Sequence, residues 1–275
     1  METTQSASAD TLVLQSLDSG VLTLTLNAQE SGNALDVAMT DALADALESV
    51  NGMSEVHCVL LCSSGKHFCT GGNVRDMQKG TDLMDGGVEQ VRERLRTRLH
   101  RITRALHDLE VPSIAAVNGP AIGAGCDLAL MCDMRLAGTR AVFAESFLRL
   151  GLVSGIGGAW YLTRIVGLAK AMELTLSSEF IDAKTAVEIG LASRLVPDYQ
   201  LEQEARDLAR RVAANTPRAL RMAKRLVKES AGSSLSAALE MAASMQAILL
   251  CGGEHKEAVT RFIERNEAEK AAQAR

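Results

Sequence analysis

Short apolar runs alternate with longer amphipathic stretches along most of this chain. Apolar and polar positions alternate on both sides of Asp18-Ser19-Gly20, over residues 11–14 and 21–26, which predicts a β-hairpin. Further apolar runs predict strands at 56–62, 111–117 and 134–137, and helical periodicity predicts helices at 36–50, 88–109 and 124–132. Strands that alternate with helices indicate an α/β fold with parallel strand pairing.

The pattern changes near Val196-Pro197-Asp198. Beyond this point it becomes all helical and more charged, with helices expected at 201–214, 217–231, 235–251 and 254–272. We therefore predict three regions: a flexible N-terminus (1–10), an α/β core (11–197) and a helical C-terminal region (198–275). Residues 1–10 carry neither the basic nor the apolar segment of an export signal, so a cytoplasmic location is expected.

The composition and net charge of the chain limit the classes of partner that it is expected to bind. The chain is 47% hydrophobic and 23% charged, as in an ordinary globular protein. The net charge of −5 argues against nucleic acid or an acidic membrane as partner, although a local basic patch is compatible with it. The 6 cysteines form no CxxC pair, so we expect reduced thiols that fill core space and no metal site.

Two glycine-rich stretches each follow a predicted strand, at 65–74 (GKHFCTGGNV) and 118–127 (NGPAIGAGCD). A strand that ends in glycines before a helix leaves backbone N–H groups unpaired, and these suit a negatively charged oxygen. If the amides of Gly72 and Ala124 point at one spot, they form an oxyanion hole. The alternative is that both stretches are only tight strand–helix turns.

The same motifs resemble the enoyl-CoA hydratase/isomerase (crotonase) superfamily over about residues 11–265. The similarity is carried by Leu26-Asn27, Asn33-Ala34-Leu35, Phe68 to Asn73 and Ala115 to Leu130, followed by Gly151-Leu152-Val153, Gly157-Gly158, Leu162-Thr163-Arg164 and Ala183 to Ala192. The G-x-S-x-G, Walker, G-x-G-x-x-G and H-E-x-x-H signatures of other enzyme classes do not occur.

This resemblance implies a spiral of ββα units with a helical C-terminal trimerisation region. It implies an acyl-CoA thioester as ligand, no separate cofactor, and a homotrimer or a hexamer made of two trimers. Gly72 and Ala124 would supply the oxyanion hole. The residues expected to bind substrate are Asn27, Ala34, Thr70, Gly71, Asn73, Val74, Gly123, Phe147 and Trp160. Thr70 has an alternative role, in which its hydroxyl only shapes the turn.

The chain departs from the family pattern at its acid–base positions. Hydratases of the family carry Glu at the positions of Asp127 and Phe147, and a phenylalanine transfers no proton. Asp127 is thus the one acid expected in the pocket, with its pKa raised by Phe147, Leu152, Val153 and Trp160. The alternative is an idle Asp127 satisfied by backbone. Glu145 and Arg149 are expected to form surface or structural pairs. The alternative is that they compensate for Phe147, because on an extended segment Glu145 and Phe147 point the same way and Ser146 points opposite. Ser154 is a candidate to hold a water.

The leading functional expectation is an acyl-CoA enzyme that stabilises a thioester enolate, with Asp127 as its single acid–base group. Hydration of a 2-enoyl-CoA is the default reaction of the family. Isomerisation, hydrolysis, decarboxylation and C–C cleavage use the same enolate pocket and remain open. A non-catalytic acyl-CoA binding protein is the alternative from another class.

Overall fold

A computed structural model describes residues 11–273, so the predicted flexible segment 1–10 lies outside the described residues. The chain divides into two compact units between Val212 and Ala213. The strands are β1 Val13–Asp18, β2 Val21–Leu26, β3 Cys58–Ser63, β4 Ser113–Val117, β5 Pro120–Ile122, β6 Met134–Gly138, β7 Val142–Ala144, β8 Ile181–Asp182 and β9 Arg194–Val196. The α-helices are α1 Val37–Ser49, α2 Val74–Lys79, α3 Val88–Arg94, α4 His100–His107, α5 Ala124–Met131, α6 Gly158–Ser177, α7 Ala183–Glu188, α8 Asp198–Ala213, α9 Pro217–Ser230, α10 Leu235–Leu250 and α11 Gly253–Gln273.

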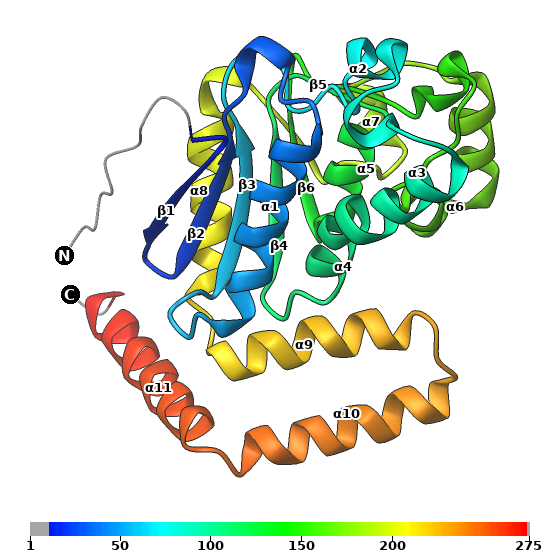
Figure 1. The fold of residues 1–275 in the computed structure, drawn as a ribbon. Coiled ribbons are helices and arrows are strands. Elements are labelled where there is room, and N and C mark those ends of the chain that lie inside the picture. The colour runs from blue at the N-terminus through cyan, green and yellow to red at the C-terminus, as the bar shows by residue number, and fades with distance from the viewer. Residues whose placement is uncertain (1–10, 274–275) are drawn as a thin grey trace. The chain divides into compact units, whose positions relative to one another are not determined.

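The first unit is built on a six-stranded sheet in the order β1-β2-β3-β4-β6-β9 (Figure 1). The strands β1 and β2 form the predicted antiparallel hairpin, and every later neighbour in this sheet pairs in parallel, also as predicted. A smaller sheet has the order β5-β7-β8. In it, β5 and β7 run parallel with Ile122 opposite Ala144, which places the middle of the second glycine stretch beside the end of β7.

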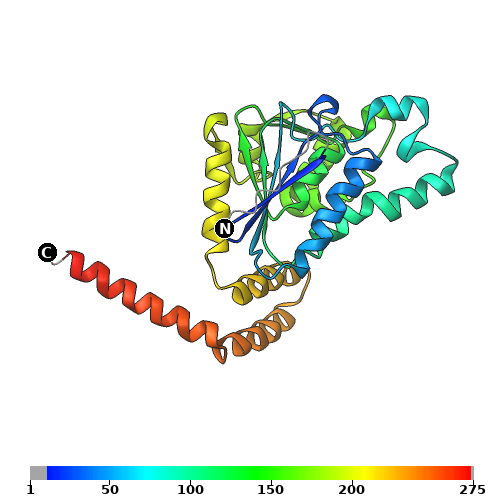
Figure 2. The ribbon, with the colours of Figure 1, turned by 60° about the vertical axis from the view of Figure 1, so that its left-hand side comes forward.

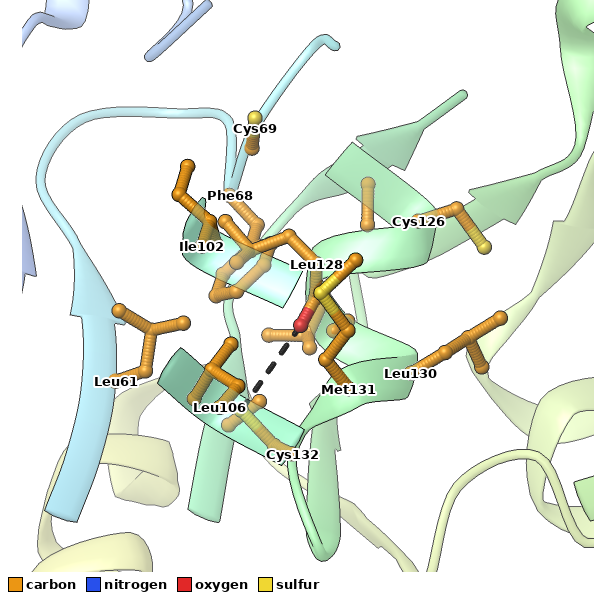
Figure 3. Packing of buried hydrophobic residues seen from close by; sticks show 14 of the residues in the cluster. Leu61, Phe68, Cys69, Ile102, Leu106, Cys126, Leu128, Leu130, Met131 and Cys132 are labelled. Atoms are coloured by element: carbon orange, nitrogen blue, oxygen red, sulfur yellow. Dashed lines mark hydrogen bonds between the residues drawn. The ribbon is translucent and has the colours of Figure 1, made fainter. Parts of the chain in front are cut away.

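The large sheet lies between α8 on one face and α1 on the other (Figures 1 and 2). Leu201, Ala205 and Ala209 of α8 are buried, so this helix belongs to the first unit. On the α1 side, Leu128 and Met131 of α5 pack with Ile102 and Leu106 of α4 (Figure 3). This apolar contact anchors α5, the helix that follows the second glycine stretch.

Most of the cysteines fill core space, as predicted. Cys58, Cys69, Cys126 and Cys132 are buried and Cys62 is half-buried, whereas Cys251 is exposed. Burial raises the pKa of the Cys62 and Cys69 thiols to about 12. These buried thiols therefore remain protonated and behave as small apolar groups.

Local signals explain where the first helices begin and break. The side chain of Asp36 accepts a hydrogen bond of 2.8 Å from the Met39 amide, which caps α1 as predicted. The single helix predicted over 88–109 is wrong in one respect, because a π-helical turn at Leu95–Leu99 separates α3 from α4. The wider turn shifts the register of the side chains, so α4 presents Ile102 and Leu106 to the core while α3 has no buried residue.

The second unit consists of α9, α10 and α11. No residue of α9 or α10 is buried, and large apolar side chains such as Leu235 and Phe262 are exposed in this unit. Over residues 11–273, no single helix is both long and apolar enough to cross a membrane. The bent pair of α10 and α11, with 73° between its halves, meets the requirement by length and composition only.

Candidate functional site

The two glycine-rich stretches meet in the structure. Cys69 forms an isolated parallel bridge with Ala121, and the Ile122 amide donates a hydrogen bond of 3.0 Å to the Cys69 carbonyl. A β-carbon placed on Gly125 would lie 1.9 Å from that carbonyl oxygen. Only glycine permits this approach, so the sequence of the second stretch is fitted to contact with the first.

The junction brings the predicted amide donors together. Gly71 has φ +83°, and a β-carbon there would lie 2.6 Å from the Ile122 carbonyl and 3.2 Å from the Ala124 nitrogen. The Gly71-Gly72 turn thus lies against the first residue of α5. Among residues 11–273, neither the Gly72 amide nor the Ala124 amide donates a hydrogen bond to the protein. Ala124 is the first residue of α5, so its amide is an orphan donor of a helix N-terminus, whereas Gly72 directly precedes the cap residue of α2.

Asp127 lies one turn further along α5. Its amide donates to the Gly123 carbonyl at 3.0 Å, and its side chain has no solvent exposure. The Ser154 hydroxyl donates a hydrogen bond of 2.6 Å to Asp127 Oδ2. A β-carbon on Gly158 would lie 1.6 Å from Asp127 Oδ1, so the backbone at Gly158 also covers the carboxyl. Asp127 is therefore a fully buried acid on the same helix as the Ala124 amide.

The covering segment, residues 154–158, is held in place by α4. His100 Nε2 forms a hydrogen bond of 2.8 Å with the Gly155 carbonyl. The Thr103 hydroxyl donates to the Ile156 carbonyl at 2.7 Å. His100 is half-buried at the edge of the core. Its contact means that α4 fixes the segment that encloses Asp127.

Asp127 is not the only acid at this point, and the prediction of a single buried acid is wrong. Glu145 is only 4% exposed and lies beside Asp127, close enough for each carboxyl to affect the pKa of the other. Arg149 makes structural contacts of the expected kind, but not with Glu145. The Arg149 guanidinium donates to the Ser178 carbonyl at 3.1 Å and stacks on the ring of Phe180.

The physical reason lies in the backbone after β7. That strand ends at Ala144, and a 3₁₀ turn at Ser146–Leu150 begins immediately, so the strand alternation used in the prediction does not continue through Phe147. Glu145 lies at the bend and turns into the core. The available sequence signal was its position directly after the buried run Phe143-Ala144.

Burial raises the pKa of Asp127 well above its ordinary value of 3.8, and the negative charge of Glu145 raises it further. The hydrogen bond from Ser154 opposes both effects because it stabilises the ionised form. Burial also raises the pKa of Glu145. Two carboxyl groups with raised pKa values at one place are typical of acid–base sites.

The apolar lining predicted for Asp127 is only partly correct. Phe147 is half-buried, and its ring lies 3.8 Å from where a β-carbon on Gly123 would be. Val153, in contrast, is 77% exposed, and Leu152 and Trp160 are exposed as well. Trp160 packs edge-on against His107 and Tyr161 and carries the Arg164 guanidinium on its face. The segment 154–158, rather than these side chains, excludes solvent from Asp127.

The remaining predicted residues border the first glycine stretch. The Thr70 hydroxyl donates to the carbonyls of Ser31 and Gly32, both at 3.3 Å, as expected if it shapes the turn. Asn73 accepts a hydrogen bond of 3.0 Å from the Arg75 amide and so caps α2.

Three further candidates for substrate binding differ in their exposure. Ala34 is buried, Val74 is 56% exposed, and the side chain of Asn27 is hydrogen-bonded to Thr11 and Ser64. The roles of these three residues in binding a substrate remain predictions. In the part of the chain that the structure describes, no group of three or more His, Cys, Asp and Glu side chains is arranged to hold a metal ion.

Known proteins are similar to this chain over nearly all of its length. The family model described as "Enoyl-CoA hydratase/isomerase" matches residues 16–271. A probable enoyl-CoA hydratase of Rhodobacter capsulatus is 34% identical over 251 residues, which are 90% of this chain and 93% of that protein. The 1,2-epoxyphenylacetyl-CoA isomerase of Escherichia coli is 32% identical over 251 residues, with coverage of 91% and 95%.

Solved structures give the same result for the fold. A putative enoyl-CoA hydratase/isomerase from Mycobacterium abscessus superimposes with a TM-score of 0.86 at 30% identity, over 92% of this chain and 96% of that one. A putative enoyl-CoA hydratase from Streptomyces coelicolor gives a TM-score of 0.85 at 32% identity, over 96% of both chains. The predicted α/β spiral fold with a helical C-terminal region is therefore confirmed.

Proposed function

Because this chain belongs to the enoyl-CoA hydratase/isomerase family, we propose that it binds an acyl-CoA thioester and stabilises its enolate with the amides of Gly72 and Ala124. The observation that supports this proposal is the junction of the two glycine stretches. Gly71 lies against the Ala124 nitrogen, and neither of the two amides has a protein acceptor among the described residues. Each donor of this kind contributes about 3–4 kcal/mol to transition-state stabilisation.

Asp127 is the acid–base group of the proposed reaction. It follows the Ala124 amide by one turn of α5, so the thioester oxygen and the acyl α-carbon of one ligand fall within reach of the same helix end. In hydration of a 2-enoyl-CoA, the carboxyl O–H gives its proton to the α-carbon. Water adds its oxygen to the β-carbon and returns a proton to the carboxylate. One carboxyl group thus completes the addition with no net gain or loss of protons.

Access to Asp127 requires a local movement. The carboxyl is fully covered by the segment 154–158, so a substrate reaches it by displacing this segment or its Ser154 hydrogen bond. Gly155 and Gly157 give the segment backbone freedom, and Gly157 has φ +107°. Closure of the segment over a bound acyl group would again exclude water from the enolate.

Isomerisation is the second candidate reaction. It moves a proton between two positions of the acyl group and therefore needs one acid–base site, not a second carboxylate at the position of Phe147. A relative that is 32% identical to this chain is named an isomerase, 1,2-epoxyphenylacetyl-CoA isomerase, although its substrate is an epoxide and not an enoyl group. Both candidates depend on the same enolate and on Asp127.

The experiment that tests the proposal is Asp127→Asn, assayed with crotonyl-CoA for hydration and with a 3-enoyl-CoA for isomerisation. Loss of turnover by about 10²–10⁴-fold with acyl-CoA binding retained, measured by calorimetry, is expected for an acid–base residue. Asp85→Asn removes an exposed carboxylate and serves as the matched control. Detectable acyl-CoA binding without turnover in the wild type would instead favour a non-catalytic binding protein.

The second unit supports an oligomeric form. Its exposed apolar side chains need a partner surface, and the residues concerned are Val227, Leu235, Leu239, Ile248, Leu250, Val259, Phe262 and Ile263. A homotrimer, alone or as a hexamer of two trimers, provides such a surface. Light scattering after size-exclusion chromatography distinguishes three or six copies from a monomer, and a monomer at micromolar concentration would contradict this proposal.

A further inference from the structure

Asp127 and Glu145 form a buried pair of carboxyl groups without a cation. Asp127 is 0% and Glu145 is 4% exposed. Over the described residues, neither forms a salt bridge, and each has one side-chain oxygen, Asp127 Oδ1 and Glu145 Oε1, that is buried without a hydrogen-bond partner. Two adjacent negative charges in such a setting would be strongly destabilising.

A single proton shared by the two carboxyl groups removes this repulsion between negative charges. When two carboxyl groups adjoin, the O–H of one donates to the other, and the pair carries one negative charge instead of two. The proton also supplies a donor between two carboxylates that otherwise offer each other only acceptors. The pair therefore has a physical reason to retain one proton at neutral pH.

The surroundings indicate which residue carries it. Asp127 is sealed by the backbone at Gly158, whereas Glu145 lines a cavity of about 10 Å³ that also touches exposed Glu179. A cavity of this size is close to the smallest that holds one water. A water there can donate a hydrogen bond to a Glu145 carboxylate, so the negative charge is better placed on Glu145 and the proton on Asp127.

The other groups that face the pair do not change this assignment. Cys126 adjoins both carboxyls, and its own pKa is raised well above its usual range by burial and by their charge, so it remains a neutral thiol. Ser154 and the Gly158 amide favour ionisation of Asp127, in opposition to Glu145. Glu179 at the cavity is a further acid and brings no positive charge to Glu145.

We propose that Glu145 is a positioning residue that holds Asp127 in its protonated form, the two side chains sharing one proton in the resting protein. The shared proton moves between the Asp127 carboxyl and the Glu145 carboxylate, so one of the two residues is protonated while the other is ionised. Its consequence rests on the proposed function: the resting enzyme is ready to give a proton to an enolate α-carbon. The proton sharing itself requires no substrate.

The decisive experiment is infrared spectroscopy of the substrate-free full-length protein during a pH titration. We expect a protonated-carboxyl C=O band at neutral pH in the wild type. Glu145→Gln keeps the shape of the side chain and removes its charge, so the titration midpoint of the Asp127 band falls by roughly one pH unit or more, a tenfold change in proton affinity. Glu179→Gln, in an exposed residue at the same cavity, is expected to leave the midpoint unchanged.

Either of two results overturns the proposal: no protonated carboxyl in the wild type at neutral pH, or an unchanged midpoint in Glu145→Gln. The first result needs no variant, so the test survives a failure of Glu145→Gln to fold. In active protein, the pH profile of kcat/KM adds a second reading, because a merely structural Glu145 would change the height of the profile and not the position of its limbs. A shared proton without turnover would refute the proposed function and leave this inference intact.

Discussion

The Ser154 hydroxyl donates to Asp127 Oδ2 at 2.6 Å while its oxygen accepts a hydrogen bond of 2.9 Å from the Gly158 amide. One serine thus joins the backbone that covers the site to the acid inside it. The two hydrogen bonds run in the same direction: the Gly158 amide donates to Ser154, and the Ser154 hydroxyl donates to the Asp127 carboxyl. This polarity stabilises an ionised Asp127 and counteracts the burial that favours the neutral acid.

Ser154→Ala should raise the pKa of Asp127, because it removes the hydrogen bond that favours the carboxylate. If activity needs the protonated acid, the alkaline limb of the kcat/KM profile moves to higher pH. This is opposite to the shift expected for Glu145→Gln. The two variants are therefore expected to shift the alkaline limb in opposite directions when both are assayed with the same acyl-CoA. Shifts in the same direction would contradict the assignment of both residues.

The same substitution should also lower stability by about 1–3 kcal/mol, because the buried Gly158 amide loses its hydrogen bond to the Ser154 hydroxyl. Urea unfolding measures this difference. Ser49→Ala is the control: its hydroxyl donates to the Ala46 carbonyl at 2.8 Å at the end of α1, away from any buried acid. We expect a smaller loss of stability there and no displacement of either limb of the pH profile.

Gly71→Ala should disturb the junction of the two glycine stretches. The left-handed conformation alone costs a non-glycine residue roughly 1–2 kcal/mol. The new β-carbon would also lie 2.6 Å from the Ile122 carbonyl and displace the backbone beside Ala124. We expect turnover to fall by roughly 100-fold, as for other displacements of reacting groups by about 1 Å.

Gly80→Ala separates these two effects. Gly80 has φ +65° but no atom within 4 Å of where its β-carbon would be. It should lose only the stability that the left-handed conformation costs, less than Gly71→Ala loses, and keep nearly normal turnover of acyl-CoA. Equal losses of turnover in the two variants would mean that contact at the junction does not position the amides.

Stability should depend on pH through the buried acids. Their pKa values are raised in the folded protein from ordinary values of 3.8 and 4.5, so the folded state binds more protons than the unfolded state above that range. Unfolding free energy therefore decreases as pH rises. Asp127→Asn removes one titrating group, and the loss of stability from mildly acidic to mildly alkaline pH should be smaller than in the wild type. An identical slope in both proteins would indicate that Asp127 is ionised when folded.

Much of the fold could be predicted because its signals are local. Asp36 is a standard helix cap, and the Asp18-Ser19-Gly20 turn joins two alternating runs, so α1 and the hairpin β1–β2 follow from short stretches of sequence. The π-helical turn at 95–99 could not be predicted, because no residue there differs from an ordinary helix former. Its register is decided by how α4 packs on the core.

The candidate site also has one feature that the sequence predicts and one that it does not. The meeting of Gly71 with Ala124 follows from glycine motifs that predict close backbone approach. The position of Glu145 does not, because a charged residue after a short strand is usually solvated, and only the turn at 146–150 directs this one inward. The partner of a buried acid is a tertiary property that spacing along the chain does not reveal.

Phe147 leads to the last prediction, which concerns the rate of hydration. Its ring borders Gly123, at the position where hydratases of the family are expected to hold a second carboxylate, and it has no proton to transfer. One carboxyl must then act as both acid and base, so kcat/KM for crotonyl-CoA should lie well below the diffusional ceiling of about 10⁸–10⁹ M⁻¹s⁻¹. Phe147→Leu should leave this value within about tenfold, since it exchanges one proton-free side chain for another. A wild-type value near the ceiling would require a further acid–base group in contact with the substrate, and Asp127 alone would no longer account for the chemistry.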